Sequence, residues 1–111
     1  MADDARTIVL LPRFTSLAGP ASGSMDVYTD PVNVREFASA QVTGFGGGTV
    51  TLQESQDLAT WTDVGSVTMT GTQPVTSFAT LDTEWVRLKI ALGTGVRLTC
   101  WVVGQFTLRG P

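Results

Sequence analysis

The sequence predicts an all-β fold, an antiparallel β-sandwich of eight or nine short strands with an extended N-terminal arm. Three observations predict it. Short runs rich in Val, Thr, Ile and aromatic residues alternate apolar and polar side chains with the period of two that half-buried strands require. Turn signals separate these runs about every 8–12 residues, the spacing of all-β domains. Only the stretch 32–40 could be argued as a helix, and it lacks an apolar stripe.

The first 24 residues are the predicted arm, and residues 25–111 are the single sandwich domain. Residues 7–11 form a short apolar strand that stops at Pro12. The stretch 12–24 contains two prolines, two glycines and four Ser or Thr hydroxyls, with Phe14 and Leu17 as its apolar anchors. An arm of this composition either lies across a neighbouring surface or wraps the edge of its own sandwich.

Strand and turn signals then follow one another through the domain. Asp30-Pro31 is a turn, because proline presets its own φ and biases the preceding residue away from helix. The run Gly46-Gly47-Gly48 is interpreted as a hairpin tip, because no Lys-Ser/Thr pair or helix follows it as in a phosphate loop. The predicted strands span residues 25–28, 37–45, 49–54, 64–70, 74–81, 85–92 and 96–108.

The clearest alternation lies in residues 85–108, which predict a β-hairpin turned by Gly93-Thr94-Gly95. In the predicted register Ile90 faces Leu98 and Leu88 faces Cys100, so that the aliphatic side chains share one face. Cys100 is then a small buried hydrophobe, and as the single cysteine it cannot form an internal disulfide.

Charge is distributed unevenly along the chain. Residues 1–84 hold all ten acids and three basic residues, whereas residues 85–111 hold four basic residues and no acid, which gives the net charge of −3. We interpret acidic and basic strands as neighbours that neutralise one another; docking between copies or on an acidic partner is the alternative. The acidic balance argues against nucleic-acid binding. No apolar run approaches the roughly 20 residues of a membrane span, and acids before the first apolar run argue against a signal peptide.

The residue inventory argues against an enzyme. Histidine is absent and cysteine occurs once, which excludes Ser-His-Asp and Cys-His nucleophiles and zinc sites with the usual nitrogen and sulfur ligands. The sequence therefore predicts no catalytic residue, no metal site and no cofactor. One carboxylate pair remains, Asp57 and Asp63 on either side of Trp61, where an exposed tryptophan could form a sugar platform. Glycoside hydrolysis by this pair is a remote alternative, because turn acids are usually solvated.

The other face of the predicted hairpin carries an outward strip in which Trp101 lies opposite Arg87. An apolar patch of this size marks an interface in a small domain. Alternatively, the N-terminal arm covers it through its two anchors, and the sequence leaves both interpretations open. The candidate interface residues are the anchors and the strip: Phe14, Leu17, Trp85, Arg87, Trp101 and Val103.

Residues 49–65, TVTLQESQDLATWTDVG, follow the pattern strand, then S-x-D-x-x-x-W-x-x-x-G, with Ser55, Asp57, Trp61 and Gly65 in the fixed places. The later segments WVRLKIALGTG and VVG fit closing strands in which an aromatic–aliphatic–Arg strand precedes a glycine turn. Over residues 32–104 the chain resembles small β-sandwich virion structural proteins of tailed phages and galactose-binding-like modules. The resemblance implies a jelly-roll or galactose-binding-like sandwich. No sugar-ligand or metal motif of the galactose-binding modules is matched.

This resemblance implies a phage virion structural protein. We expect a capsid decoration (cement) protein, which stabilises the assembled shell because it binds that state alone. The expected partners are the major capsid protein or other virion subunits and further copies of the chain in a homo-oligomer such as a trimer, with no nucleic acid and no membrane. The expected location is the virion, after synthesis in the host cytoplasm without a signal peptide. A tail or head–tail connector component is the neighbouring alternative. A carbohydrate-binding module that uses Trp61 or Trp101 with Asp57 or Asp63 is the alternative from another class.

Overall fold

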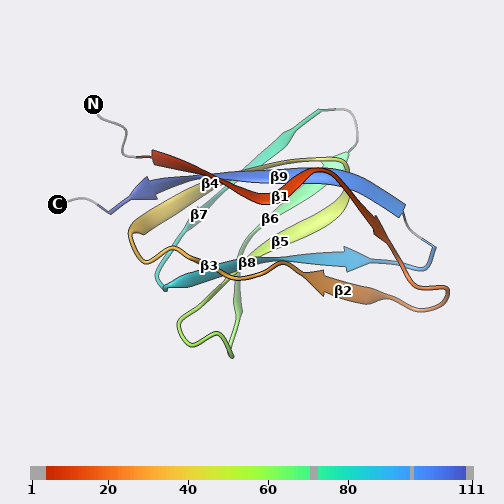
Figure 1. Cartoon of the computed structure of the whole chain (residues 1–111), viewed down its shortest axis with the longest axis horizontal. Coiled ribbons are helices and arrows are strands. Elements are labelled where there is room, and N and C mark those ends of the chain that lie inside the picture. The colour runs from red at the N-terminus through yellow and green to blue at the C-terminus, as the bar shows by residue number, and fades with distance from the viewer. Residues whose placement is uncertain (1–4, 71–72, 96, 110–111) are drawn as a thin grey trace.

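The computed structural model of the chain describes residues 5–70, 73–95 and 97–109, and within these ranges it contains strands and no helix (Figure 1). No helix in the described part is therefore long and apolar enough to cross a membrane. The strands are β1 (Ala5–Ala18), β2 (Met25–Tyr28), β3 (Val32–Asn33), β4 (Phe37–Phe45), β5 (Gly47–Ser55), β6 (Thr62–Thr70), β7 (Val75–Thr80), β8 (Trp85–Leu92) and β9 (Arg97–Leu108).

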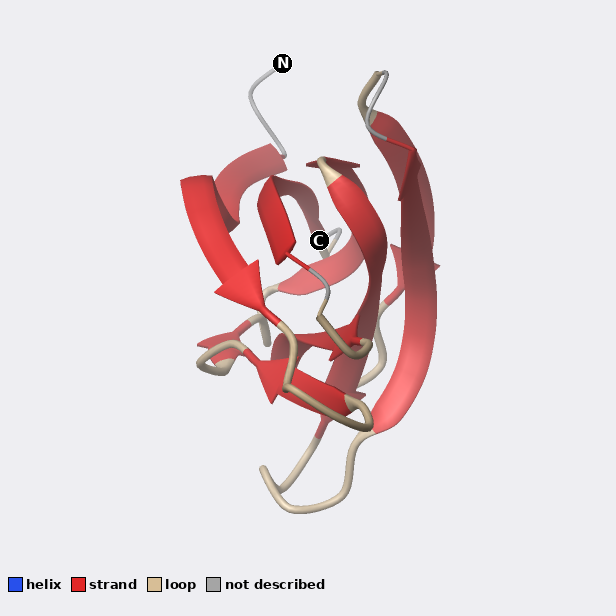
Figure 2. Ribbon diagram, turned by 90° about the vertical axis from the view of Figure 1, so that its right-hand side faces the viewer, coloured by secondary structure: helices blue, strands red, loops and turns tan. Residues whose placement is uncertain are grey.

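These strands form two antiparallel sheets that pack face to face, so the predicted β-sandwich is confirmed (Figures 1 and 2). Sheet A has four strands in the order β1-β9-β4-β7. Sheet B has five strands, in the order β2-β8-β5-β6 with β3 also paired to β8. Except at β2–β3 and β5–β6, every connection carries the chain from one sheet to the other. Strands that are neighbours in the sequence therefore mostly face each other across the core.

The predicted hairpin of residues 85–108 is wrong, although its first strand is predicted to the residue. Strand β8 belongs to sheet B and β9 to sheet A, so Ile90 pairs with Val27 and Val50 and does not pair with Leu98. The turn is a corner between sheets, where Gly95 has a φ of +69° and its N–H donates to the Pro20 carbonyl. Two strands whose apolar faces meet across a core alternate in the same way as two strands that pair edge to edge. The pattern could not distinguish these arrangements.

The glycine run is a second corner and not a hairpin tip. Strand β4 ends at Phe45 in sheet A, and β5 begins at Gly47 in sheet B. Gly46 between them has a φ of 141°, a conformation that side-chain-bearing residues rarely adopt. The glycine is therefore needed because the chain changes layers over a single residue.

Much of the predicted arm is a strand of the sandwich. Strand β1 pairs antiparallel with β9, from Ala5 opposite Thr107 to Ala18 opposite Arg97. The pairing shifts between Val9 and Leu11 and again between Leu11 and Thr15, around Pro12, which has no N–H to donate to a ladder. The first shift lets consecutive residues Leu10 and Leu11 both face the core. Composition predicted an irregular extended segment but not its partner β9.

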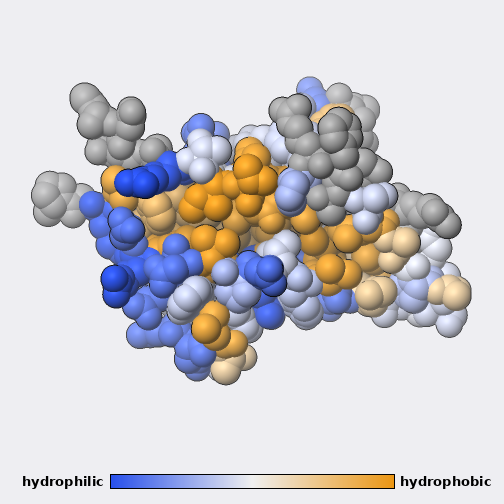
Figure 3. Space-filling view, in the orientation of Figure 1, coloured by the Kyte–Doolittle hydropathy of each residue, from blue (hydrophilic) through white to orange (hydrophobic). Residues whose placement is uncertain are grey.

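The core lies between the two sheets and is aliphatic, with Phe37 and Phe106 rings 5.5 Å apart at one end. Cys100 is 1% exposed within it, which confirms the prediction of a buried cysteine, and burial raises the pKa of its thiol. A side chain at Gly104 would collide with the Phe106 ring. Apolar surface also runs along the edge between β1 and β2 (Figure 3), where Ile8, Leu17 and Val27 are only partly buried.

Candidate functional site

The outer face of sheet B gathers aromatic and charged side chains from three strands. Alternation along β8 buries Val86, Leu88 and Ile90 and turns Arg87 and Lys89 outward. Strand β2 on one side contributes Asp26 and Tyr28, and β5 on the other contributes Thr51 and Gln53, which lie opposite Lys89 and Arg87. The Lys89 ammonium lies 3.8 Å from the Asp26 carboxylate.

The centre of this face is the arginine stack, formed by Tyr28, Arg87 and Trp61. The guanidinium carbon of Arg87 lies 4.0 Å from the Tyr28 ring centroid and 4.1 Å from that of Trp61. Arg87 Nε donates to Gln53 Oε1 at 2.9 Å, and Gln53 Nε2 donates to Asp63 Oδ1 at 2.8 Å. The cation is thus held by aromatic quadrupoles on both sides and by a hydrogen bond in its own plane.

A hydrogen-bonded turn between β5 and β6 brings Trp61 to this position. The Ser55 hydroxyl accepts from the N–H groups of Asp57 and Leu58, at 3.2 and 2.9 Å. Asp57 Oδ1 accepts from the N–H groups of Ala59 and Thr60, at 2.9 and 2.8 Å, and from the Ser55 hydroxyl at 3.1 Å. These bonds, led by that from Thr60, lower the pKa of the Asp57 carboxyl. The S-x-D-x-x-x-W pattern is therefore the structural signature of a turn that presents the tryptophan.

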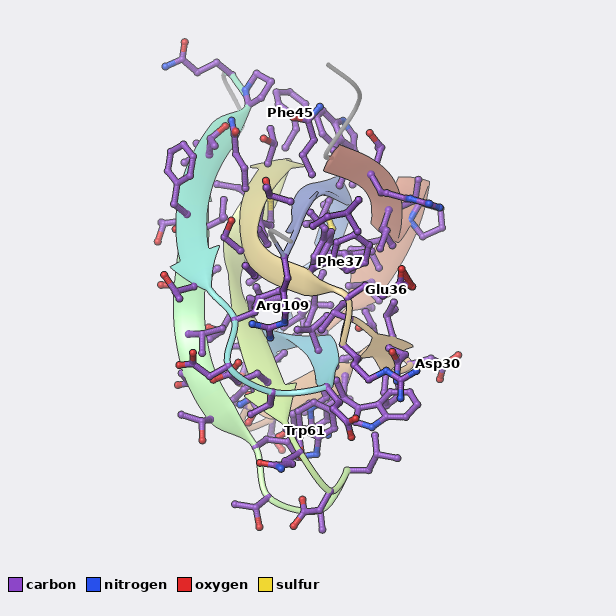
Figure 4. The ribbon with its side chains drawn as sticks, turned by 90° about the vertical axis from the view of Figure 1, so that its left-hand side faces the viewer. Asp30, Glu36, Phe37, Phe45, Trp61 and Arg109 are labelled. Atoms are coloured by element: carbon purple, nitrogen blue, oxygen red, sulfur yellow. The ribbon has the colours of Figure 1, made fainter. Side chains whose placement is uncertain are left out.

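The outer face of sheet A is different in character, and we call it the uncharged face. Phe45 and Trp101 stack on it with centroids 6.1 Å apart, and Val9 lies opposite Val103. Phe78 on the edge strand β7 is 75% exposed. Figure 4 shows Phe45 and Trp61 on opposite sides of the sandwich. The uncharged face comprises the paired rows from Trp101 to Thr107 of β9, where the described outward side chains are Thr7, Val9, Ser39, Gln41, Thr43, Phe45, Thr76, Phe78, Thr80, Trp101, Val103, Gln105 and Thr107, none of them charged.

The predicted outward strip is split between these two faces. Trp85 and Arg87 lie on sheet B, whereas Trp101 and Val103 lie on sheet A, because the hairpin that would have joined them does not form. Arg87 therefore packs against Tyr28 and Trp61, and the predicted pairing with Trp101 is wrong. All of these tryptophans are partly buried, so none is a wholly exposed platform.

The remaining predicted residues have distinct positions. Leu17 is partly buried against the core from β1, and the side chain of Phe14 lies outside the described residues. Asp63 accepts a hydrogen bond from Gln53, which in turn accepts one from Arg87 of the arginine stack, while Asp57 is exposed and organises the turn. Among the described residues, no group of three or more Asp, Glu or Cys side chains could hold a metal ion.

Tyr28, Gln53 and Phe45 were not identified from the sequence as candidate site residues. Tyr28 had a usable signal, since Asp26 and Tyr28 alternate with Val27 on a predicted strand. Its strand partner β8 lies far along the sequence, and no local pattern identifies that pairing. Phe45 was hidden in the same way, because its contact with Trp101 depends on β4 pairing with β9.

Sequence comparison finds no matching protein family and no matching curated protein. Several solved structures are similar in fold. The PBSX exported protein XepA matches 96% of this chain with a TM-score of 0.64 and 15% identity, and the chain spans 38% of the length of XepA. A family 29 carbohydrate binding module matches 93% of this chain and 88% of its own length, with a TM-score of 0.52 and 10% identity. A mutant of the family 29 module CBM29-2 matches 95% of this chain and 93% of its own length, with a TM-score of 0.53 and 14% identity. These likenesses show a shared β-sandwich fold.

Proposed function

We propose that this chain is a structural protein of a tailed-phage virion, a capsid decoration (cement) protein that binds the assembled shell through the uncharged face. The character of that face carries the proposal: Val9 is 57% exposed and Phe78 75% exposed, on the same face as the Phe45–Trp101 pair. Exposed apolar side chains gathered on one face of a small domain mark an interaction surface. The resemblance of residues 49–65 to virion proteins supports the same class, and so does the fold likeness to XepA.

The mechanism is stabilisation by mass action. A protein that binds only the assembled shell shifts the equilibrium toward assembly by the free energy of its binding. The described side chains of the uncharged face carry no charge. Docking there therefore avoids the free-energy cost of removing charged side chains of this face from water. Binding should therefore depend weakly on salt, unlike docking driven by charge.

The partners in this proposal are the major capsid protein or other virion subunits, and the protein resides in the virion. A homo-oligomer such as a trimer would place several uncharged faces around a local symmetry axis of the shell. A tail or head–tail connector component would use the same face against a different ring of subunits. Co-sedimentation with isolated heads and with isolated tails separates these locations.

The test uses shells that lack the chain, mixed with purified protein and sedimented. The variant Phe78→Glu places a charge on the uncharged face and should weaken shell binding by about tenfold or more, since a buried unpaired charge costs at least ~1.4 kcal/mol. Ser66→Glu, an exposed residue of β6 in sheet B, is the matched control and should bind like the wild type. Equal binding by the two variants, or no sedimentation of the wild type with heads or tails, contradicts the proposal.

A second candidate function is carbohydrate binding at the outer face of sheet B. The observation that favours it is the arginine stack, where two aromatic rings flank a fixed polar group beside Gln53 and Asp63. Aromatic rings offer apolar area to the C–H faces of sugars, and polar groups with fixed positions select the hydroxyls. The likeness in fold to family 29 carbohydrate binding modules supports this class.

Trp61→Ala and Trp101→Ala form a matched pair for testing it, because each removes a partly buried tryptophan from an opposite face. Retention of the wild type and of Trp101→Ala on immobilised polysaccharides, with loss for Trp61→Ala, supports carbohydrate binding at sheet B. Equal retention of both variants on every polysaccharide that binds the wild type contradicts it.

A further inference from the structure

We infer that Arg87 is a recognition point for a carboxylate, so that the ligand of the outer face of sheet B is an acidic polysaccharide containing uronic acid residues. This inference rests on the carbohydrate-binding candidate and names its substrate class. It follows from three features of the arginine stack: the fixed plane of its guanidinium, the unused donors on that plane, and the missing counter-charge.

The plane of the guanidinium is fixed from both sides. The rings of Tyr28 and Trp61 lie 4.0 and 4.1 Å from its central carbon, and Nε is anchored on Gln53 Oε1 at 2.9 Å. Gln53 is itself oriented, because its amide nitrogen donates to Asp63. Arginine loses a large side-chain entropy when it is ordered, and here the protein has ordered it before any ligand arrives.

The donors that remain point to a carboxylate. A guanidinium has five N–H groups, and in the part of the chain that the structure describes only Nε has a hydrogen-bond acceptor. The terminal nitrogens Nη1 and Nη2 together present a planar edge that matches the two oxygens of a carboxylate in a bidentate pair. Such pairs are short, directional and stronger than hydrogen bonds to neutral hydroxyls.

The counter-charge is missing from the same surroundings. Among the described residues the one ion pair is Lys89–Asp26, so no carboxylate lies within 4.0 Å of the Arg87 guanidinium. Asp63, the nearest acid in the network, is engaged through the Gln53 amide. Lys89, two residues along β8 on the same face, is paired with Asp26, so that ion pair supplies no counter-charge to Arg87. Arg87 is thus a partly buried cation that lies between two aromatic rings and has no carboxylate ion-pair partner among the described residues, an environment that favours an anionic ligand.

A sugar is favoured over other carboxylates because the anion site is bordered by aromatic rings and hydroxyls. Tyr28 is 46% exposed beside the guanidinium, which leaves ring surface for the C–H groups of a pyranose. Thr51 and Thr49 continue the outer face along β5, and Thr49 is hydrogen-bonded to Thr68 on β6 at 3.4 Å. An extended polymer can follow these hydroxyls across the sheet while one carboxylate pairs with Arg87.

The first test changes only the ligand. Binding of an oligogalacturonate to the wild-type protein is compared by calorimetry with binding of its fully methyl-esterified form, which has the same sugar ring and no charge. We expect the ester to bind at least about tenfold more weakly. Equal affinity for acid and ester overturns the inference while leaving carbohydrate binding intact. No binding of these or of neutral polysaccharides overturns both.

The second test changes the protein. Arg87→Lys keeps the charge but loses the planar edge, and we expect it to weaken oligogalacturonate binding by about tenfold. Arg6→Gln, an exposed arginine on β1 of sheet A, removes one charge elsewhere and should change affinity less than about twofold. Unchanged affinity of Arg87→Lys would mean that charge alone attracts the ligand, and a loss in Arg6→Gln as large as that in Arg87→Lys would mean that the effect is not specific to this site; either result overturns the inference. Poly-glutamate is the third probe: if it binds as tightly as the oligogalacturonate, the assignment to a sugar is overturned.

Discussion

The guanidinium of Arg87 on β8 lies 4.1 Å from the ring of Trp61, a residue of the turn that joins β5 and β6. This contact links the turn to the sheet. We expect a double-mutant cycle with Arg87→Ala and Trp61→Ala to give a coupling free energy of about 0.5–1 kcal/mol, as for other partly exposed cation–π pairs. Urea unfolding of the four proteins measures it.

The matched control is the same cycle carried out at Lys89, a second cation on β8, whose ammonium pairs with Asp26. The cycle of Lys89→Ala with Trp61→Ala should show coupling close to zero. A coupling as large as that for Arg87 would mean that the two charges act on the turn in a non-specific way.

The second prediction concerns pH. Hydrogen bonds from Thr60, Ala59 and Ser55 lower the pKa of Asp57 in the folded protein below its ordinary value of 3.8. The stabilisation from ionised Asp57 is therefore complete above the unfolded-state pKa and is lost as the pH falls through the lower folded-state pKa. We expect the difference in melting temperature between wild type and Asp57→Asn to be largest near neutral pH and to shrink below about pH 4. A difference that grows on acidification contradicts this role for Asp57.

The third prediction concerns Gly104. A methyl group there would overlap the Phe106 ring, which is fully buried and cannot move aside freely. We expect Gly104→Ala to lower the free energy of unfolding by about 1–3 kcal/mol, the usual cost of overpacking. Gly65→Ala is the control: its methyl group would meet Ala79 at 3.5 Å, an ordinary contact, and should change stability little. Equal effects of the two substitutions in denaturant melts would contradict the packing argument.

The fourth prediction concerns the single cysteine. Burial raises the pKa of the Cys100 thiol, and the side chain is 1% exposed. Because thiolates are the reactive form, a disulfide reagent should label Cys100 in the native protein many times more slowly than in the protein unfolded in urea. Rapid labelling of native protein at pH 8 would show that β9 opens readily between β1 and β4.

The limits of sequence prediction are clear from β8 and Cys100. The bounds of β8 follow from strict alternation, and the burial of Ile90 and Cys100 follows from their place in that alternation. The partner of each strand does not follow, because facing strands of two sheets and paired strands of one sheet carry the same pattern. For this reason the connection from β8 to β9 was predicted as a hairpin, although it is a corner between the two sheets.

The candidate site could be predicted only as far as local chemistry reaches. The turn from Ser55 to Trp61 has a local signature, and its hydrogen bonds explain it. The contact of Arg87 with Tyr28 depends on β2 lying beside β8, which the tertiary fold decides. The sequence therefore predicts the site residues that lie within one local turn, and it does not predict those that strand pairing brings to the site from distant parts of the chain.

The position of β9 in the middle of sheet A has a consequence for the order in which the protein is made. Among the described strands, β9 is synthesised after all the others, yet it lies between β1 and β4 in sheet A and pairs with both. Sheet A cannot be completed until β9 has been synthesised, and until then the apolar inner face of sheet B has no full cover. The sandwich must therefore fold as a cooperative step after β9 has been synthesised, and the nascent chain carries exposed strand edges that favour aggregation until that step occurs.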